Sequence, residues 1–474
     1  MKERSDSSSL KNSRKEKRRK IVIIGAGSAA FGLSSLVWLM KHKDLYGMEM
    51  VLVDIAEDRL KTIEKLANIL NKAWNSNMTI SSSTGYREVL KGSDYIIISV
   101  AVDRVQAWQK DIEIALKYNI SHVGENGGPG GFIHAARNLS LILPIIEDIK
   151  ILAPDAFVLN FTNPMQRICT ALNKFMPNRF VGICHQIHLG YFILGVAFAE
   201  QLRIDLYPGI RWEWNNEKIA RAFEISDKAE EVFSIKAAGI NHFTWFMDVF
   251  KRNDNKSVYK EFIKKMHSLP ESFEPLTQEI FKIFGHVPLA GDNHISEYLP
   301  YTSDFRSGTF KDFDIQSFNF GSYLERGETS WNKIKDVVYG RKEPDSLLGA
   351  RSENAEKIIA AFEKNKNSYF ESLNMPNNGS ISNLPGEAIV DIPAVIGAGG
   401  VSGITIGELP KTVAELCRKQ LIINEMTVEA VVCGDIKLVY QLMALDPMVN
   451  NLDTAIKISD EYIRSNLKYL PGFK

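Results

Sequence analysis

The sequence predicts an α/β fold in which a doubly wound parallel sheet is followed by a helix-rich α+β part. Short apolar runs alternate with helical patterns from residue 21 to about residue 185. Strands separated by helices are typical of a parallel sheet that helices cover on both faces. Beyond about residue 190 the alternation weakens, and long amphipathic helices separated by Gly- and Pro-rich loops take over.

The first apolar run ends in a glycine-rich turn, which is the strongest motif in the chain. Gly25, Gly27 and Ala30 occupy the small positions of a G-x-G-x-x-A pattern, and residues 28–41 then read as a helix. Gly25 supplies the tight turn, while Gly27 lets the backbone approach a pyrophosphate. Ser28 opens the helix, whose N-terminus would face the phosphates.

An acidic residue completes this motif after the second apolar run, residues 50–53. Asp54 can accept hydrogen bonds from both ribose hydroxyls, and its carboxylate disfavours the 2′-phosphate of NADP. We therefore expect a Rossmann-type unit that binds NAD through Gly25, Gly27, Ser28 and Asp54. The alternative is an ordinary glycine turn between a strand and a helix.

The remaining elements follow from hydrophobic periodicity. Further strands are expected at residues 95–100, 156–159 and 180–183, and helices at 58–74, 139–151, 255–267, 352–373, 411–433 and 453–468. Loops are expected at 374–385 and 396–403. We predict three regions: a disordered basic tail over 1–20, a dinucleotide-binding domain over 21–190, and a catalytic, substrate and oligomerisation domain over 191–474.

Composition and charge limit the classes of function. The chain has 474 residues, of which 45% are hydrophobic and 24% charged, as in a globular protein of two domains. Its net charge is zero, and the only strongly basic segment is residues 1–20, a solubilising extension more than a nucleic-acid arm. Neither a signal-peptide core nor 18 consecutive apolar residues occur, so we expect a cytoplasmic protein without membrane or nucleic-acid partners. The four cysteines lack CxxC spacing, so neither a disulfide scaffold nor a zinc ribbon is expected.

Polar residues follow two predicted strands at the edge where doubly wound sheets bind ligands. Asn163 comes after the strand at 156–159, and Cys184 with His185 after the strand at 180–183. Cys184 and His242 together offer two ligands to a divalent metal. Taken singly, each has an alternative as a buried core residue, and spacing alone does not bring the two together.

Two further motifs are ambiguous. Residues 124–131 contain five glycines and precede Arg137 on an expected helix, so they form either a loop over the ligands or a plain surface loop. Asp292 lies in the run Gly-Asp-Asn-His, where its carboxylate is equally suited to act as a general base or to cap a helix.

In their order, these motifs resemble glycoside hydrolase family 4, whose members are NAD-dependent glycosidases. The resemblance covers about residues 20–474. The residues that carry it are the Gly25–Gly32 loop with Asp54, residues 127–131 with Arg137, residues 160–164, Cys184-His185, residues 239–243, residues 291–294, residues 383–385 and residues 444–447.

The resemblance implies a mechanism and roles for individual residues. Such enzymes bind NAD⁺ and a divalent metal, usually Mn²⁺, and oxidise the sugar at C3. A base then removes the C2 proton, the leaving group departs by elimination, water adds at C1, and the hydride returns. Cys184 and His242 match the metal ligands, His185 the acid that protonates the leaving group, and Asn163 a residue that hydrogen-bonds the sugar. Asp292 aligns with the base of some members, and Arg137 is assigned to substrate binding.

The resemblance also implies a lactate/malate dehydrogenase-like C-terminal part, a homodimer or homotetramer, and a small oligosaccharide or glycoside as substrate. Members that act on phosphorylated sugars tend to have Asp where this chain has His185, so an unphosphorylated α-glycoside is expected. The motifs are closest to the α-galacturonidase branch, with α-galactosidase and α-glucosidase as alternatives. Outside the family, a simple NAD-dependent hydroxy-acid or sugar dehydrogenase and a non-catalytic NAD sensor stay open.

Overall fold

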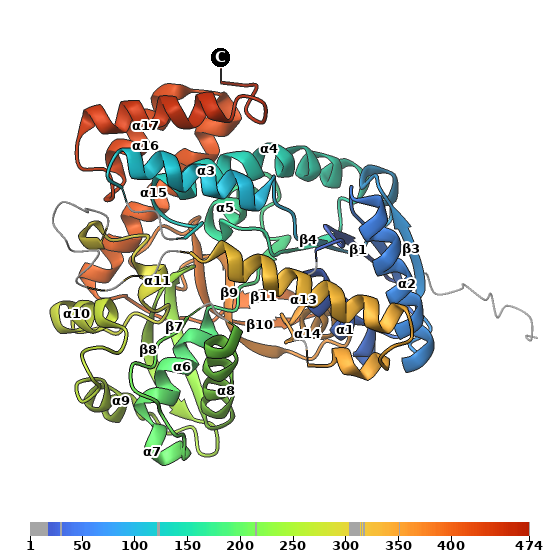
Figure 1. The fold of residues 1–474 in the computed structure, drawn as a ribbon, viewed down its shortest axis with the longest axis horizontal. Coiled ribbons are helices and arrows are strands. Elements are labelled where there is room, and N and C mark those ends of the chain that lie inside the picture. The colour runs from blue at the N-terminus through green and yellow to red at the C-terminus, as the bar shows by residue number, and fades with distance from the viewer. Residues whose placement is uncertain are drawn as a thin grey trace, which may run out of the picture.

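The computed structural model describes residues 18–28, 31–120, 124–213, 216–302, 313, 315, 318–349 and 351–473. Most of the predicted tail at 1–20 and the Ala30 position lie outside these residues. The described strands form one 11-stranded sheet with the order β3-β2-β1-β4-β5-β6-β9-β10-β7-β8, with β11 paired to β10. Helices lie on both sides of this sheet (Figure 1), which confirms the α/β class and the Rossmann-type N-terminal part.

The N-terminal strands are parallel and follow the predicted apolar runs closely. Their order of β3-β2-β1-β4-β5-β6 is that of a doubly wound sheet with its switch point between β1 and β4. Both faces of β1, β2 and β4 are buried because helices cover the sheet on each side. The strands are β1 (Lys20–Ile24), β2 (Glu49–Val53), β3 (Thr79–Ser83), β4 (Tyr95–Ile98), β5 (Phe157–Asn160) and β6 (Phe180–Gly182).

The C-terminal strands extend the same sheet in antiparallel fashion, across the domain boundary predicted at residue 190. A single pair, Gly182 with Asn374, joins β6 to β9, and a single pair, Gly239 with Asp391, joins β7 to β10. The loop between β7 and β8 has only two residues, Asn241 and His242. The strands are β7 (Phe233–Ile240), β8 (Phe243–Lys251), β9 (Ser368–Pro376), β10 (Ile389–Gly397) and β11 (Gly400–Gly403).

The helices pack in groups that mix the two halves of the chain. In Figure 1, α13 and α14 lie beside α1 and α2, while α15, α16 and α17 lie over α3, α4 and α5. The helices are α1 (Phe31–Lys41), α2 (Glu57–Trp74), α3 (Arg104–Lys117), α4 (Gly128–Leu152), α5 (Met165–Phe175), α6 (Ile187–Ala197), α7 (Ala199–Leu202), α8 (Asn216–Val232), α9 (Tyr259–Met266), α10 (Pro275–Phe284), α11 (Asp292–Ile295), α13 (Phe320–Val338), α14 (Ala355–Glu363), α15 (Lys411–Cys433), α16 (Ile436–Leu445) and α17 (Leu452–Ser465). Among the described residues, no helix combines the length and apolarity needed to cross a bilayer.

Three predicted elements are wrong. The helix expected over 352–373 ends at Glu363, and β9 begins five residues later, because the central position in the sheet decides the conformation there. The loop expected at 396–403 is the end of β10 with β11. Within the glycine cluster, residues 128–131 form the first turn of α4, with Pro129 in the position where its missing N–H costs nothing.

Arg137, predicted to bind substrate, lies in the core between three helices. Its side chain is 1% exposed, and its guanidinium donates to Asp111 on α3 at 2.8 Å and to the Asn466 amide oxygen at 3.1 Å. It is not among the residues that line the cavity described below. Because Asp111 already pairs with this charge, the prediction is corrected: Arg137 ties α4 to α3 and to the end of α17.

We expect Arg137→Met to lower the free energy of unfolding by about 3–5 kcal/mol, because it leaves the buried Asp111 carboxylate without its cation. Urea unfolding followed by circular dichroism measures the loss. Adding Asp111→Leu to the same chain should restore most of the stability, and the kcat of folded protein should change less than twofold. A large loss of kcat at full folding would contradict the structural role.

Candidate active site

A cavity of about 370 Å³ opens at the carboxyl ends of β5 and β6. Its wall combines the segments after these two strands with residues 124–126, the β7–β8 loop, α11 and the start of α13. This is the edge where a doubly wound sheet binds ligands. The structure therefore brings together Asn163, Cys184, His185 and His242, which the sequence analysis singled out.

Cys184 and His242 face each other in the cavity wall. Cys184 follows β6, and its Sγ lies 3.3 Å from Nε2 of His242. His242 is the second loop residue between β7 and β8 and has φ of 63°, a left-handed conformation that costs a non-glycine residue about 1 kcal/mol. A thiol and an imidazole at this separation fit a shared divalent cation, since both donors are soft to borderline.

The second ring nitrogen of His242 contacts the glycine-rich segment. Nδ1 lies 2.9 Å from the side-chain Nδ2 of Asn126, whose Oδ1 accepts from the N–H of Met165 at 3.3 Å. In this arrangement Nδ1 of His242 accepts a hydrogen bond from the Asn126 amide, and the ring proton is on Nε2, which faces Cys184. A half-turn of the Asn126 amide would let Nδ1–H donate instead, which leaves Nε2 available to a cation.

Burial keeps both groups uncharged when no cation is bound. It raises the pKa of the Cys184 thiol to about 12, and it lowers the pKa of His242 well below its ordinary value. The nearby His294 and His185 lower the pKa of His242 further. A cation that binds here would therefore displace the thiol proton.

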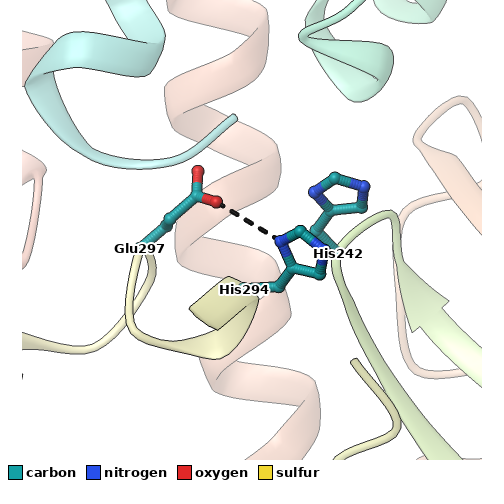
Figure 2. Close-up of side chains that lie close together, drawn as sticks. All are labelled: His242, His294 and Glu297. Atoms are coloured by element: carbon teal, nitrogen blue, oxygen red, sulfur yellow. Dashed lines mark ion pairs between the residues drawn. The ribbon is translucent and has the colours of Figure 1, made fainter. Parts of the chain in front are cut away.

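His294 and Glu297 lie beside His242, as Figure 2 shows. The imidazole of His294 stacks on that of His242, with ring centroids 4.1 Å apart and planes inclined by 28°. Oε1 of Glu297 lies 3.7 Å from Nδ1 of His294. The ligand atoms of these three side chains lie within 4.8 Å of one another, so they are a second candidate for a cation. Nearly stacked rings direct their nitrogens poorly at one ion, so we favour the Cys184–His242 pair.

Glu297 has a second contact that explains part of the glycine cluster. Its Oε2 accepts from the backbone N–H groups of Asn126 and Gly127, both at 2.7 Å. A Cβ on Gly124 would lie 1.8 Å from Oε1, and one on Gly127 would lie 2.5 Å from the Glu297 carbonyl oxygen. Glycine is thus required at Gly127, where a side chain would meet the Glu297 backbone, whereas at Gly124 a side chain would displace the Glu297 carboxylate.

Glu125 is a site residue that the sequence analysis did not single out. Its carboxylate is 2.5 Å from Nδ2 of Asn163 and pairs with Arg104 at 2.9 Å. The side chain is almost fully buried, yet it lines the cavity. Its position inside the glycine cluster was the available signal, since a carboxylate among glycines has no role in a turn.

His185 contacts a second carboxylate that had no sequence signal. Nδ1 of His185 lies 3.1 Å from Oε2 of Glu353, and both side chains line the cavity. Burial is the largest single influence and lowers the pKa of His185, but the charge of Glu353 and its hydrogen bond together raise the pKa overall. Glu353 thus fixes the orientation of the His185 ring through Nδ1.

The glycine turn after β1 has the geometry that a dinucleotide requires. Gly25 has φ of 94°, and a Cβ there would lie 1.9 Å from the carbonyl oxygen of Ser99. Asp54 directly follows β2, and its carboxylate accepts from the N–H of Gly27 at 2.8 Å. Ser28 directly follows the turn. These residues therefore present a tight turn beside an acid at the end of the second strand, which fits NAD.

Asp292 does not line the cavity. Its buried carboxylate accepts from the N–H groups of Leu276 at 3.1 Å and Thr277 at 2.7 Å, the free donors at the start of α10. Burial and the charge of Glu274 raise the pKa of Asp292 to about 8. Of the two roles weighed for this residue, the geometry favours capping over proton transfer with the substrate.

Comparison with protein families shows which family the chain belongs to. Residues 20–191 match the family 4 glycosyl hydrolase model, and residues 237–449 match the model of its C-terminal domain. The chain belongs to family 4 of the glycosyl hydrolases. It is therefore a glycosidase, and the resemblance found in the sequence is confirmed.

The relatives differ in substrate. The chain is 31% identical to an α-glucosidase of Erwinia rhapontici, in an alignment that covers 96% of this chain and 99% of the relative. It is 28% identical to an α-galactosidase of Rhizobium meliloti, in an alignment that covers 96% of this chain and 89% of that relative. The identity to an α-galacturonidase of Thermoanaerobacterium saccharolyticum is 27%, in an alignment that covers 96% of this chain and 97% of that relative.

Solved structures share the fold. A 6-phospho-α-glucosidase from gut microorganisms in complex with NAD and Mn²⁺ gives a TM-score of 0.77 at 20% identity, over 97% of this chain and 100% of the other. A 6-phospho-β-glucosidase from Thermotoga maritima with manganese, NAD⁺ and glucose-6-phosphate gives a TM-score of 0.76 at 19% identity, over 96% of this chain and 99% of the other.

We expect Asp292→Asn to lower the free energy of unfolding by about 1–3 kcal/mol, because an amide has one acceptor oxygen where two backbone N–H groups now bind. The same change should alter kcat less than about tenfold. A general base contributes roughly 10²–10⁴-fold, so a loss of kcat in that range at full folding would instead make Asp292 the base.

The same variant has a pH signature. The folded-state pKa of Asp292 of about 8 lies above that of an unfolded aspartate, so this group stabilises the folded chain at low pH. That contribution is lost as the pH rises from about 4 to about 8. Unfolding free energies measured across this range should fall less steeply for Asp292→Asn than for the unchanged chain.

Proposed function

We propose that this family 4 enzyme is an NAD- and Mn²⁺-dependent glycosidase that cleaves unphosphorylated α-glycosides. The observation that carries the proposal is the Cys184–His242 pair, 3.3 Å apart in a cavity at the carboxyl edge of the nucleotide-binding sheet. The NAD and manganese in the two structural neighbours support both cofactors. Gly25, Gly27, Ser28 and Asp54 would hold the dinucleotide.

The two cofactors supply chemistry that side chains lack. A divalent cation held by Cys184 and His242 would polarise adjacent sugar hydroxyls as a Lewis acid. NAD⁺ would accept a hydride from C3 of the sugar and later return it. The protein contributes orientation, hydrogen bonds and proton transfer around these two steps.

Asn163 and His185 are the residues of this chain that we assign to the sugar. Asn163 lines the cavity, and its Nδ2 donates a hydrogen bond to Glu125, which fixes the orientation of the amide. The amide oxygen can then accept a hydrogen bond from a sugar hydroxyl. His185, held at Nδ1 by Glu353, would present Nε2 to the glycosidic oxygen and donate a proton as the bond breaks. Since Asp292 lies behind the wall, a different cavity group would take the C2 proton.

Charge in the cavity bears on the substrate class. The described lining includes four carboxylates, from Glu125, Glu213, Glu297 and Glu353, against the arginines Arg104 and Arg326. Arg104 already pairs with Glu125, and Lys218 with Glu213. Among the described residues, a uronate that recruited Arg104 would have to draw it away from Glu125. We therefore favour a neutral α-hexoside, glucoside or galactoside, over the galacturonide expected from the sequence motifs.

The direct test is release of p-nitrophenol from its α-glucoside, α-galactoside and α-galacturonide. Activity should require both NAD⁺ and Mn²⁺ and should fall at least about 100-fold in Cys184→Ser. No net NADH should accumulate, whereas a simple dehydrogenase would accumulate it. Activity that survives chelation, or that survives Cys184→Ser, would refute the metal assignment.

On the same panel, we expect kcat/KM for the galacturonide to be at least about 100-fold below that for the better neutral hexoside. Like charges in a partly desolvated site cost several kcal/mol, and each 1.4 kcal/mol is about tenfold. The α-galactoside and α-galacturonide differ only at C6, so the ratio of their kcat/KM values measures the effect of the carboxylate alone. A preference for the galacturonide would restore the prediction made from the motifs.

We expect Glu353→Gln to lower kcat/KM by about 10–100-fold for methyl α-glycosides and much less for p-nitrophenyl glycosides. A poor leaving group needs a well-placed acid, whereas p-nitrophenolate leaves without one. In a His185→Gln background, the further substitution of Glu353 should have almost no effect, because its role is exerted through that ring. Equal losses for both leaving groups would contradict this assignment.

A further inference from the structure

Directly behind the Cys184–His242 pair lies a buried carboxylate that no step of the proposed reaction uses. Asp391 on β10 is 1% exposed and is surrounded by donors. Its Oδ1 accepts from the hydroxyl of Ser372 at 2.6 Å, and its Oδ2 accepts from amides of Gln186, Asn241 and Asn374 at 2.5, 3.2 and 3.5 Å. Every contact is a donated hydrogen bond, which favours the ionised carboxylate, but burial is the larger influence and raises the pKa of Asp391 above its usual value.

Gln186 links this carboxylate to the backbone of His242. Its Nε2 donates to Asp391, and its Oε1 accepts from the N–H of His242 at 2.8 Å. Only one orientation of the amide satisfies both contacts. Gln186 is itself 1% exposed and lies two residues after Cys184, so a single side chain spans the two segments that carry the proposed metal ligands.

The loop that carries His242 needs such a support. It consists of Asn241 and His242 alone, and His242 adopts the positive φ that normally selects glycine in a tight turn. Asp391 holds both loop residues, Asn241 directly through its side chain and His242 through Gln186. The strand that carries Asp391 meets β7 at one register pair, Asp391 with Gly239.

We propose that Asp391, acting through Gln186, is a positioning residue that sets the affinity of the Cys184–His242 pair for a divalent cation. Asp391 touches neither cation nor substrate; it fixes the backbone from which the His242 ring projects toward the sulfur. The inference rests on the proposed function only in taking Cys184 and His242 as the ligands. It predicts a defect in metal binding, separate from any defect in folding or in NAD binding.

The test is the dissociation constant for Mn²⁺, measured by titration calorimetry on purified, chelator-treated full-length protein. Asp391→Asn should weaken Mn²⁺ binding about 10–100-fold, the usual effect of losing a group that orients a ligand. NAD⁺ affinity should stay within about twofold, because the glycine turn lies after β1, away from Asp391. If Asp391→Asn does not fold, Gln186→Met, which removes only the connecting amide, should show the same loss.

Glu371→Gln supplies the matched control. Glu371 is a mostly buried carboxylate on β9 that bonds Tyr191, Ser234 and Arg252, and it does not line the cavity. Its loss should lower the thermal midpoint to a similar degree while leaving Mn²⁺ affinity unchanged. The inference is overturned if folded Asp391→Asn or Gln186→Met binds Mn²⁺ within twofold of the unchanged chain, or if Glu371→Gln weakens binding equally. Absence of Mn²⁺ binding by the unchanged chain would refute the metal assignment instead.

Discussion

The geometry of the site depends on how the imidazole of His242 is held. Each ring nitrogen faces a different segment, Nδ1 toward Asn126 and Nε2 toward Cys184, and the backbone N–H is bound by Gln186. Without these contacts, a histidine at positive φ in a two-residue loop would have several ring orientations of similar energy. The contacts select the one that points at the sulfur.

These contacts form at the seam where the parallel and antiparallel parts of the sheet meet. Only Gly182 and Asn374 join β6 to β9, and Cys184 comes two residues after that pair. A Cβ on Gly182 would lie 2.9 Å from the Asn374 Cβ, so the close approach of the strands needs glycine. Because strand pairing ends at this point, the edge of the sheet next to the glycine turn after β1 is lined by side chains and not by hydrogen bonds between strands.

Sequence reasoning located the parts of the site that local rules determine. The glycine turn, Asp54, Asn163 and Cys184 were found because each follows a recognisable strand whose carboxyl end lies at one edge. Glu353 and Asp391 were missed because their roles arise from strand and helix packing over more than 150 residues of separation. No local pattern distinguishes them from other acids of the C-terminal part.

Arg137 and Asp292 show a different limit. Both lie within motifs of the family, but a motif shows that a position matters without showing how. Arg137 pairs with Asp111, and Asp292 caps α10. Likewise, β9 was read as helix because its apolar residues continue the spacing of α14, whereas burial within the sheet imposes the strand.

The preference for a neutral sugar follows from the state of the cations already in the cavity. A divalent ion held here would bring two positive charges, of which the Cys184 thiolate would neutralise one. Arg104 is linked to the predicted sugar contact Asn163 through Glu125, which is only 6% exposed. Turning Arg104 toward a uronate would leave the Glu125 charge buried without its partner, a cost of several kcal/mol that the new ion pair must first offset. A neutral hydroxymethyl group makes no such demand, and it leaves Glu125 free to keep the Asn163 amide in place.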